Sequence, residues 1–145
     1  MWDRSENQIT LVLIRHGATK SNIEHRYLGK MDELLSKEGE RQLVEYKKLH
    51  LYPNIDFLFT SPMKRCIQTA NILYPELQPV QMKEWEEMDF GAFEGKNYVE
   101  LQGNKLYQAW IDSNGTLPFP EGESREEFIT RCNKGFRGMV EKVEQ

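Results

Sequence analysis

An apolar run that stops at a basic residue and a histidine constrains this chain more than any other stretch of its sequence. Residues 9–14 (ITLVLI) are rich in β-branched side chains, and Arg15, His16 and Gly17 follow them directly. Such a run predicts a strand that is covered on both faces of a parallel sheet. Because ligands bind at the carboxyl ends of parallel strands, we expect Arg15 and His16 to belong to a binding site. Taken alone, these residues also fit a strand end whose side chains are simply solvated.

The rest of the sequence alternates between short apolar runs and helical segments. We predict strands at residues 55–60 and 79–82, and helices at residues 37–49, 63–74, 98–101, 105–111 and 124–145. Ser36 is a suitable N-cap for the first of these helices, and Ser124 with Glu127 forms a capping-box pattern for the last. The alternation predicts an α/β domain of three layers, in which helices cover both faces of a mainly parallel sheet.

Two further segments have distinct expected roles. Residues 112–123 contain Asn-Gly, Pro-Phe-Pro and Glu-Gly, and this long loop is a candidate lid. The last helix carries an apolar stripe that we expect to pack in the core rather than to bind a cofactor. The stripe consists of Phe128, Cys132, Phe136, Met139 and Val143.

Composition limits the class of protein. The chain has 145 residues and is 39% hydrophobic, which is enough for a single domain, residues 1–145, with its own core. The formal net charge of −4 argues against nucleic acid as a partner, so any anion must be bound by a local cluster of charges. We expect neither export nor contact with a membrane, because no suitable apolar segment occurs. The sparse cysteines, Cys66 and Cys132, favour a reducing compartment, and we expect a cytoplasmic protein.

Arg65 is a second indication of an anion site. It falls in the first turn of the predicted helix at residues 63–74, shortly after the predicted strand at residues 55–60. The helix macrodipole disfavours a positive side chain at this position, which makes most sense if a negative ligand lies in front of it. A surface arginine that tolerates a slightly unfavourable field is the alternative.

Several separated pieces of the sequence together resemble the histidine phosphatase superfamily, the phosphoglycerate mutase-like proteins. Four of them are residues 15–22 (RHGATKSN), residues 26–39 with Gly29, residues 61–70 (SPMKRCIQTA) and residues 87–95 (EMDFGAFEG). A fifth, Gly122-Glu123-Ser124 with Phe128 and Arg131, falls where the family carries a similar run. The resemblance covers nearly the whole chain and rests on the order and spacing of all the pieces.

The resemblance implies how a phosphoryl group would be held. His16 would be the nucleophile that accepts it, since a neutral imidazole nitrogen can attack phosphorus at neutral pH. Arg15 and Arg65 would bind the phosphoryl oxygens and offset their charge, with no metal and no other cofactor. Asn22 and Gly29 would add further contacts to the same phosphate.

The resemblance also implies an acid, Glu87, which would protonate the leaving oxygen and then activate water as a base. The neighbouring carboxylates of Glu84, Glu86 and Asp89 should favour its protonated form. From the residues alone, Glu87 cannot be distinguished from Glu86 or from an ordinary carboxylate of an acidic loop.

Residues 87–95 are similar to the small phosphatase branch, which includes α-ribazole-5′-phosphate phosphatases. We therefore predict a phosphomonoesterase that acts through a phosphohistidine on a small phosphorylated metabolite, such as α-ribazole 5′-phosphate or a sugar phosphate. A phosphoglycerate mutase is the alternative among enzymes. An inactive phosphate-binding fragment is the alternative from another class.

The family's second catalytic histidine lies in a His-Gly motif after the last helix, whereas neither His25 nor His50 lies in such a motif. The resemblance implies that the chain lacks this C-terminal part and the last strand or strands of its sheet. The edge beside residues 9–14 would then stay open, with unpaired backbone groups. We expect lower stability or pairing with another chain, as in a homodimer, and slow or absent turnover unless His25 replaces the missing histidine.

Overall fold

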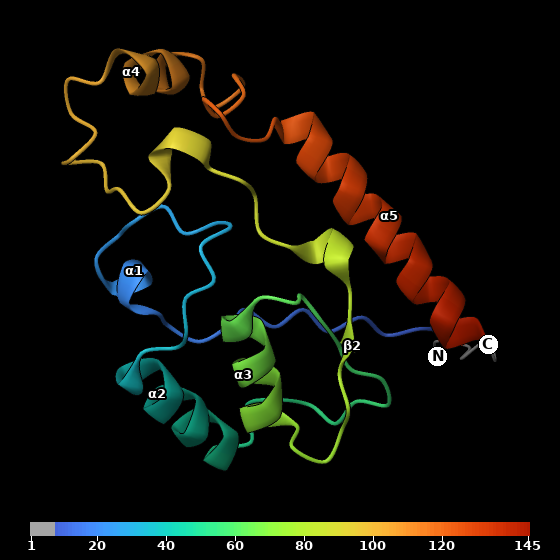
Figure 1. Ribbon diagram of the computed structural model, residues 1–145. Helices are drawn as coiled ribbons and strands as arrows, with labels where there is room; N and C mark the ends of the chain where they lie inside the picture. Colours follow the sequence, from blue (N-terminus) through green and yellow to red (C-terminus); the bar gives the residue numbers. More distant parts are fainter. Residues whose placement is uncertain (1–7) are drawn as a thin grey trace, which may run out of the picture.

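The computed structural model describes residues 8–145 and has an α/β arrangement (Figure 1). Its elements are α1 (Lys20–Ile23), α2 (Lys37–Lys48), β1 (Phe59–Thr60), α3 (Lys64–Leu73), β2 (Val80–Gln81), the short 3₁₀ turns η1 (Lys83–Trp85) and η2 (Gly91–Phe93), α4 (Lys105–Asp112) and α5 (Arg125–Glu144). Strands β1 and β2 pair in parallel, with Phe59 opposite Val80. The predicted α/β class with a parallel sheet is confirmed. No helix in residues 8–145 is long and apolar enough to cross a bilayer.

The two predicted caps are formed. Ser36 Oγ accepts a hydrogen bond of 2.9 Å from the Gly39 backbone N–H at the start of α2. At the start of α5, Ser124 Oγ accepts from the Glu127 N–H (3.1 Å), and Glu127 Oε2 accepts from the Ser124 N–H (2.8 Å). Both arrangements satisfy N–H groups that the first helical turn leaves free. The helix predicted at residues 98–101 is a series of turns instead.

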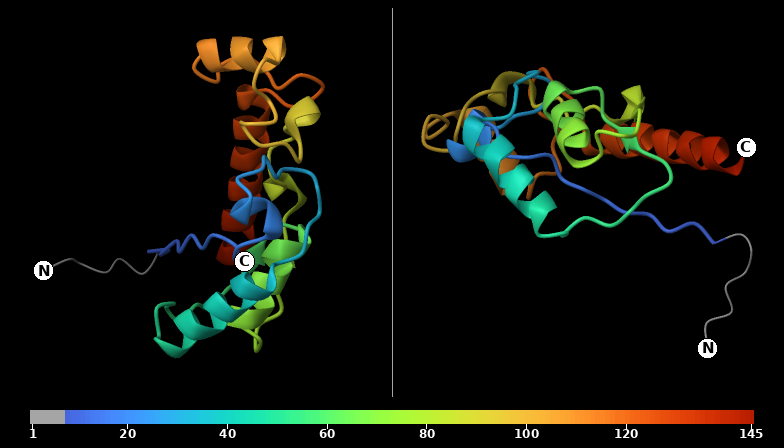
Figure 2. Two further views of the ribbon diagram at one scale, coloured as in Figure 1. Left: turned by 90° about the vertical axis from the view of Figure 1, so that its left-hand side faces the viewer. Right: turned by 90° about the horizontal axis from the view of Figure 1, so that it is seen from below.

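Two apolar clusters stabilise opposite ends of the molecule in Figure 1. The first lies where α2 packs on α3 and contains Leu35, Leu43, Leu73 and Tyr74. The second surrounds Phe93 of η2 with aromatic rings; its members include Tyr27, Phe90, Tyr107, Trp110 and Phe119. Helix α5 runs along one side of the molecule in Figure 1 and contacts η1. Figure 2 shows the same arrangement from two further directions.

Residues 9–14 do not form the covered strand that their composition predicts. Ile9, Leu11 and Leu13 are 47%, 49% and 86% exposed. A strand needs a neighbour for its N–H and C=O groups, and no segment of residues 8–145 pairs with this one. Residues 9–14 therefore form no edge of the sheet, and the open edge expected beside them stays a prediction. The strands predicted at residues 55–60 and 79–82 are shorter than expected and are reduced to the two-residue β1 and β2.

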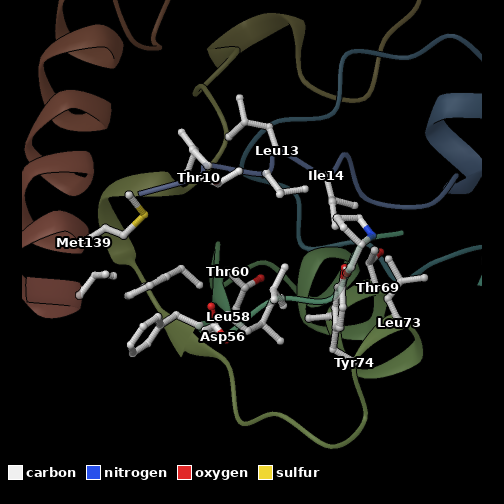
Figure 3. Close-up of a pocket in the computed structure, with 18 of the residues that line it drawn as sticks. Thr10, Leu13, Ile14, Asp56, Leu58, Thr60, Thr69, Leu73, Tyr74 and Met139 are labelled. Atoms are coloured by element: carbon white, nitrogen blue, oxygen red, sulfur yellow. The ribbon is translucent and has the colours of Figure 1, made fainter. Parts of the chain in front are cut away.

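An apolar cavity of about 670 Å³ separates residues 9–14 from residues 53–61. Figure 3 shows Leu13 and Ile14 on one side of it and Leu58 on the opposite side. Met139 of α5 reaches the cavity from a third direction. The extended segment that precedes His16 is thus separated from the parallel pair rather than continuous with it.

The side chains of the apolar stripe predicted on α5 lie in different environments. Met139 is buried and lines the apolar cavity, whereas Phe128 and Cys132 line a smaller pocket. Phe136 is 45% exposed, so its assignment to the core is wrong. The buried position of this turn is Gly135, because the helix packs so closely on η1 that a Cβ there would meet the indole nitrogen of Trp85.

The loop between α4 and α5 is bonded to the segment around η2. The Ala92 N–H donates to the Pro120 carbonyl (2.8 Å), and the Glu123 N–H donates to the Asp89 carbonyl (3.0 Å). Phe119 is buried between these bonds in the second cluster. Movement of this loop as a lid stays a prediction.

Candidate active site

His16 follows the extended segment, and a neighbouring carbonyl group sets the protonation of its ring. Nδ1 lies 2.7 Å from the carbonyl oxygen of Gly17. A carbonyl oxygen can only accept a hydrogen bond, so in the neutral ring Nδ1 carries the proton and Nε2 keeps a free lone pair. The Gly17 N–H donates to Thr69 Oγ1 (3.0 Å), which fixes this turn against α3. The ring therefore has one nitrogen available as a nucleophile.

The surroundings of His16 lower its pKa. Burial of the ring is the largest cause, because it disfavours the charged imidazolium, and the positive charges of Arg65 and Arg15 act in the same direction. The hydrogen bond with Gly17 and the carboxylate of Glu87 oppose these effects and raise the pKa. On balance the pKa falls, which keeps the ring neutral, and so able to attack phosphorus, at neutral pH.

Arg65 is almost completely buried at the start of α3, with 1% of its surface exposed. Its Nη1 donates to the Met31 carbonyl (2.9 Å) and its Nη2 to the Gly29 carbonyl (3.0 Å). The Nε–H is buried and has no acceptor among the residues that the structure describes. Since a buried N–H without an acceptor is costly, this donor is suited to an oxygen of a bound anion.

Both backbone polar groups of Gly29, which the resemblance implies to be a phosphate contact, are bonded to other groups of the protein. Its N–H is already used, because it donates to Glu94 Oε2 (3.1 Å), while its carbonyl accepts from Arg65. A Cβ at this position would collide with the carbonyl oxygen of Met88. Glycine is therefore required for the close packing of two backbone segments, and the Gly29 carbonyl helps to hold the arginine. Its contact with a phosphate stays a prediction.

Asn22 has a local structural role through its amide oxygen, and the phosphate contact that the resemblance implies for it stays a prediction. Its Oδ1 accepts from the Thr19 N–H (3.0 Å) and from Thr19 Oγ1 (3.1 Å), and its own N–H donates to Thr19 Oγ1 (3.2 Å). These bonds form a capping box at the start of α1. Asn22 is not among the residues that line the pocket beside His16.

A pocket of about 160 Å³ lies beside His16 and brings together segments that are distant in the sequence. Its lining consists of His16, Ser61, Met63, Arg65, Cys66, Trp85, Glu86, Glu87, Phe128 and Cys132. Arg15 is exposed and does not line this pocket, although its charge acts on His16. Of the predicted site residues, His16, Arg65 and Glu87 therefore share one pocket, whereas Arg15, Asn22 and Gly29 do not line it.

The structure distinguishes the two adjacent carboxylates. Glu86 and Glu87 both line the pocket, but the charge of Glu87 acts on His16, whereas that of Glu86 acts on Arg131. Glu87 Oε1 also accepts a hydrogen bond from the Met88 N–H (2.8 Å), which restrains its carboxylate. Glu87 is therefore the carboxylate better placed to exchange a proton with a group bound at His16.

The other candidate histidine is in a different position. His25 is exposed, adopts a left-handed backbone conformation with φ of 55°, and is not part of the pocket lining. Within residues 8–145, no group of three or more histidine, cysteine, aspartate or glutamate side chains is arranged to hold a metal ion. Trp85 and Met63 line the pocket as well, and the sequence alone gave neither of them a role.

Comparison with known proteins identifies the family. Residues 11–145 match the family model of the histidine phosphatase superfamily (branch 1). The chain belongs to this superfamily. It is 39% identical over 125 residues to a protein of Bacillus subtilis (strain 168) named uncharacterized phosphatase PhoE, covering 85% of this chain and 60% of that protein. It is 31% identical over 139 residues to the 2,3-bisphosphoglycerate-dependent phosphoglycerate mutase of Bifidobacterium longum (strain DJO10A), covering 88% and 56%.

The fold has solved counterparts in the same superfamily. The crystal structure of the alpha-ribazole phosphatase from Shigella flexneri is similar with a TM-score of 0.76 at 25% sequence identity. The match covers 90% of this chain and 67% of that one. The chain thus spans little more than half the length of the two curated relatives, at 60% and 56%.

Proposed function

We propose that this chain belongs to a phosphomonoesterase, and that the enzyme works through a phosphohistidine at His16. The observation that carries the proposal is that one pocket is lined by a neutral histidine with a free Nε2, a buried arginine with an unused Nε–H, and a restrained carboxylate. These are the three groups that a metal-free transfer of a phosphoryl group needs: a nucleophile, a fixed positive charge and an acid.

The reaction would proceed in two steps. In the first, the Nε2 lone pair of His16 attacks phosphorus, the bond from phosphorus to the ester oxygen breaks, and Glu87 gives its proton to the departing alcohol. Arg65 offsets the charge on the phosphoryl oxygens. In the second, the Glu87 carboxylate takes a proton from water, the water oxygen attacks phosphorus, and the bond between Nε2 and phosphorus breaks to release inorganic phosphate.

The pocket lining supports a substrate whose alcohol part is uncharged. Beyond the reacting groups, the apolar part of the wall includes Trp85, Phe128 and Met63, and Ser61, Cys66, Cys132 and Glu86 complete it. The charged residues of the lining are Arg65, Glu86 and Glu87, so a substrate carboxylate would meet two negative side chains. This arrangement favours hydrolysis of a phosphomonoester such as α-ribazole 5′-phosphate or a sugar phosphate over isomerisation of a phosphoglycerate.

A phosphoglycerate mutase is the second candidate, because curated relatives at 31% identity carry that name. The two functions are separated by mixing the protein with 3-phosphoglycerate and 2,3-bisphosphoglycerate, and in parallel with p-nitrophenyl phosphate. Phosphorus NMR then distinguishes 2-phosphoglycerate from free phosphate. We expect free phosphate from p-nitrophenyl phosphate and none from the His16→Ala variant. Accumulation of 2-phosphoglycerate would favour the mutase, and phosphate binding without any turnover would leave an inactive phosphate-binding chain.

A further inference from the structure

Arg131 of α5 uses every N–H donor of its side chain to bond either to residues 84–87, the segment that carries Glu87, or to the carboxylate of Glu123. Nη1 donates to the carbonyl oxygens of Glu84 (2.9 Å) and Glu86 (2.6 Å), and Nη2 donates to the carbonyl oxygen of Glu87 (3.0 Å). Nε and Nη2 also donate to Glu123 Oε1 (2.6 Å) and Oε2 (2.9 Å). A guanidinium group has five N–H donors, so these bonds use all of them.

This use of donors determines what Arg131 can do. It leaves no N–H for a phosphoryl oxygen, so Arg131 does not bind the substrate directly. Three of its five acceptors are backbone carbonyls of residues 84–87, including the one before and the one at Glu87 itself. Fixing the carbonyls on both sides of the Glu87 Cα fixes the direction in which its side chain leaves the backbone.

Further contacts keep Arg131 itself in place. Glu123 also accepts a hydrogen bond from the Asp89 N–H (3.3 Å), so this carboxylate joins Arg131 to the far side of Glu87. The guanidinium carbon lies 5.0 Å from the ring centroid of Phe128, one helical turn earlier on α5. Trp85 Nε1 donates to the Cys132 carbonyl (3.3 Å), which adds a second bond between α5 and the same segment.

We propose that Arg131, held by Glu123, is the positioning residue that aims the carboxyl group of Glu87 at the leaving oxygen. The proposal rests on the proposed phosphomonoesterase function. It adds a residue outside the pocket lining to the machinery of proton transfer. Lysine cannot replace Arg131, because a single ammonium group lacks the planar fork that reaches a carboxylate and three carbonyls together.

The experiment compares two esters that differ in how much they need an acid. p-Nitrophenolate leaves readily without a proton, whereas an alkoxide such as that of ethyl phosphate does not. We expect Arg131→Gln to lower kcat/KM about tenfold more on ethyl phosphate than on p-nitrophenyl phosphate, because kcat/KM reflects the steps up to departure of the alcohol and not the later attack of water, which both esters share. Glu87→Gln should give the same selective loss, and the double variant should lose no more than Glu87→Gln alone. Arg131→Lys should fail to restore the rate on ethyl phosphate.

The control is Arg137→Gln, which removes an exposed arginine of the same helix and should affect neither ester. Equal losses of kcat/KM on both esters in Arg131→Gln would overturn the proposal. If Arg131→Gln does not fold, Glu123→Gln takes its place, since it removes the charge that holds the guanidinium while keeping the shape of the side chain. The same selective loss is then expected, and equal losses would again overturn the proposal.

A second measurement separates this proposal from the proposed function. Hydrogen exchange monitors the amides of Trp85, Glu86 and Met88, whose N–H groups are bonded within the segment. In Arg131→Gln these amides should exchange about tenfold faster than in Arg137→Gln, while those of α2 stay unchanged. Unchanged exchange at these amides would contradict the positioning role. A wild-type chain that hydrolyses neither ester would contradict the proposed function instead.

Discussion

The two adjacent glutamates of the pocket illustrate what is decided at the scale of single residues. Glu86 and Glu87 are chemically identical, and the family resemblance alone selects the second of them. In the structure the carboxylate of Glu87 acts on His16, whereas that of Glu86 acts on Arg131. A difference of one position along the chain therefore separates the carboxylate that acts on His16, our proposed proton donor, from one that acts on Arg131.

Exchange of these two residues tests the assignment. Glu87→Gln should lower kcat for an alkyl phosphate by roughly 10²–10⁴-fold, the usual scale for general acid–base catalysis, and leave phosphate binding intact. Glu86→Gln is the matched control and should stay close to wild type. Steady-state kinetics with isothermal titration of phosphate measures both quantities. Loss of turnover in Glu86→Gln alone would show that the acid lies one position earlier.

Arg15 is suited to a second test because it is exposed and its substitution should not disturb the fold. Its positive charge lowers the pKa of His16, so Arg15→Gln should raise that pKa towards the ordinary value for histidine. The neutral nucleophile is then lost at a higher pH, and the acidic limb of the rate profile should move upward. NMR titration of the imidazole checks the shift, with exposed His25 as internal reference. A pKa that stays constant or falls would contradict the described site.

Helices and strands differ in how far the sequence predicts them. Ser36 and Ser124 mark the starts of α2 and α5 correctly, because a cap is formed by residues within four positions of each other. Residues 9–14 have the composition of a buried strand, yet they remain unpaired and exposed, because a strand depends on a partner from elsewhere in the chain. The roles of Gly29 and Arg131 likewise depend on contacts between distant segments, and neither could be deduced from local sequence.

The contribution of the Ser124 N-cap to the stability of α5 can be tested by substitution. Ser124→Ala removes the side-chain acceptor of the Glu127 N–H and should cost about 1 kcal/mol of unfolding free energy. This corresponds to a fall in Tm of roughly 3–5 °C for a chain of this size. Thr130→Ala, at an exposed position inside the same helix, should change Tm much less. Equal shifts in calorimetry for the two variants would mean that the cap does not stabilise the helix.

The whole molecule consists of two packed clusters and an extended segment, residues 9–14, that lines a cavity. Ile14 of this segment packs against the first cluster, whereas Leu13 is exposed. Leu43→Ala, in the first cluster, should lower the unfolding free energy by about 2–5 kcal/mol, because that side chain is buried. Leu13→Ala removes the same atoms from an exposed site and should cost less than about 0.5 kcal/mol. Urea unfolding measures both. A large loss for Leu13→Ala would show that residues 9–14 are covered in solution, by a second copy or another segment.

The most direct test of the central claim is the position of the phosphoryl group on the protein. The protein is incubated with p-nitrophenyl phosphate, quenched in alkali, which preserves phosphohistidine, and analysed by tandem mass spectrometry and by phosphorus–proton NMR. Because Nδ1 of His16 is bonded to the Gly17 carbonyl, we expect one phosphoryl group on Nε2 of His16 and none in His16→Asn. A phosphoryl group on Nδ1, on another residue, or on no residue of the wild-type protein would contradict the account.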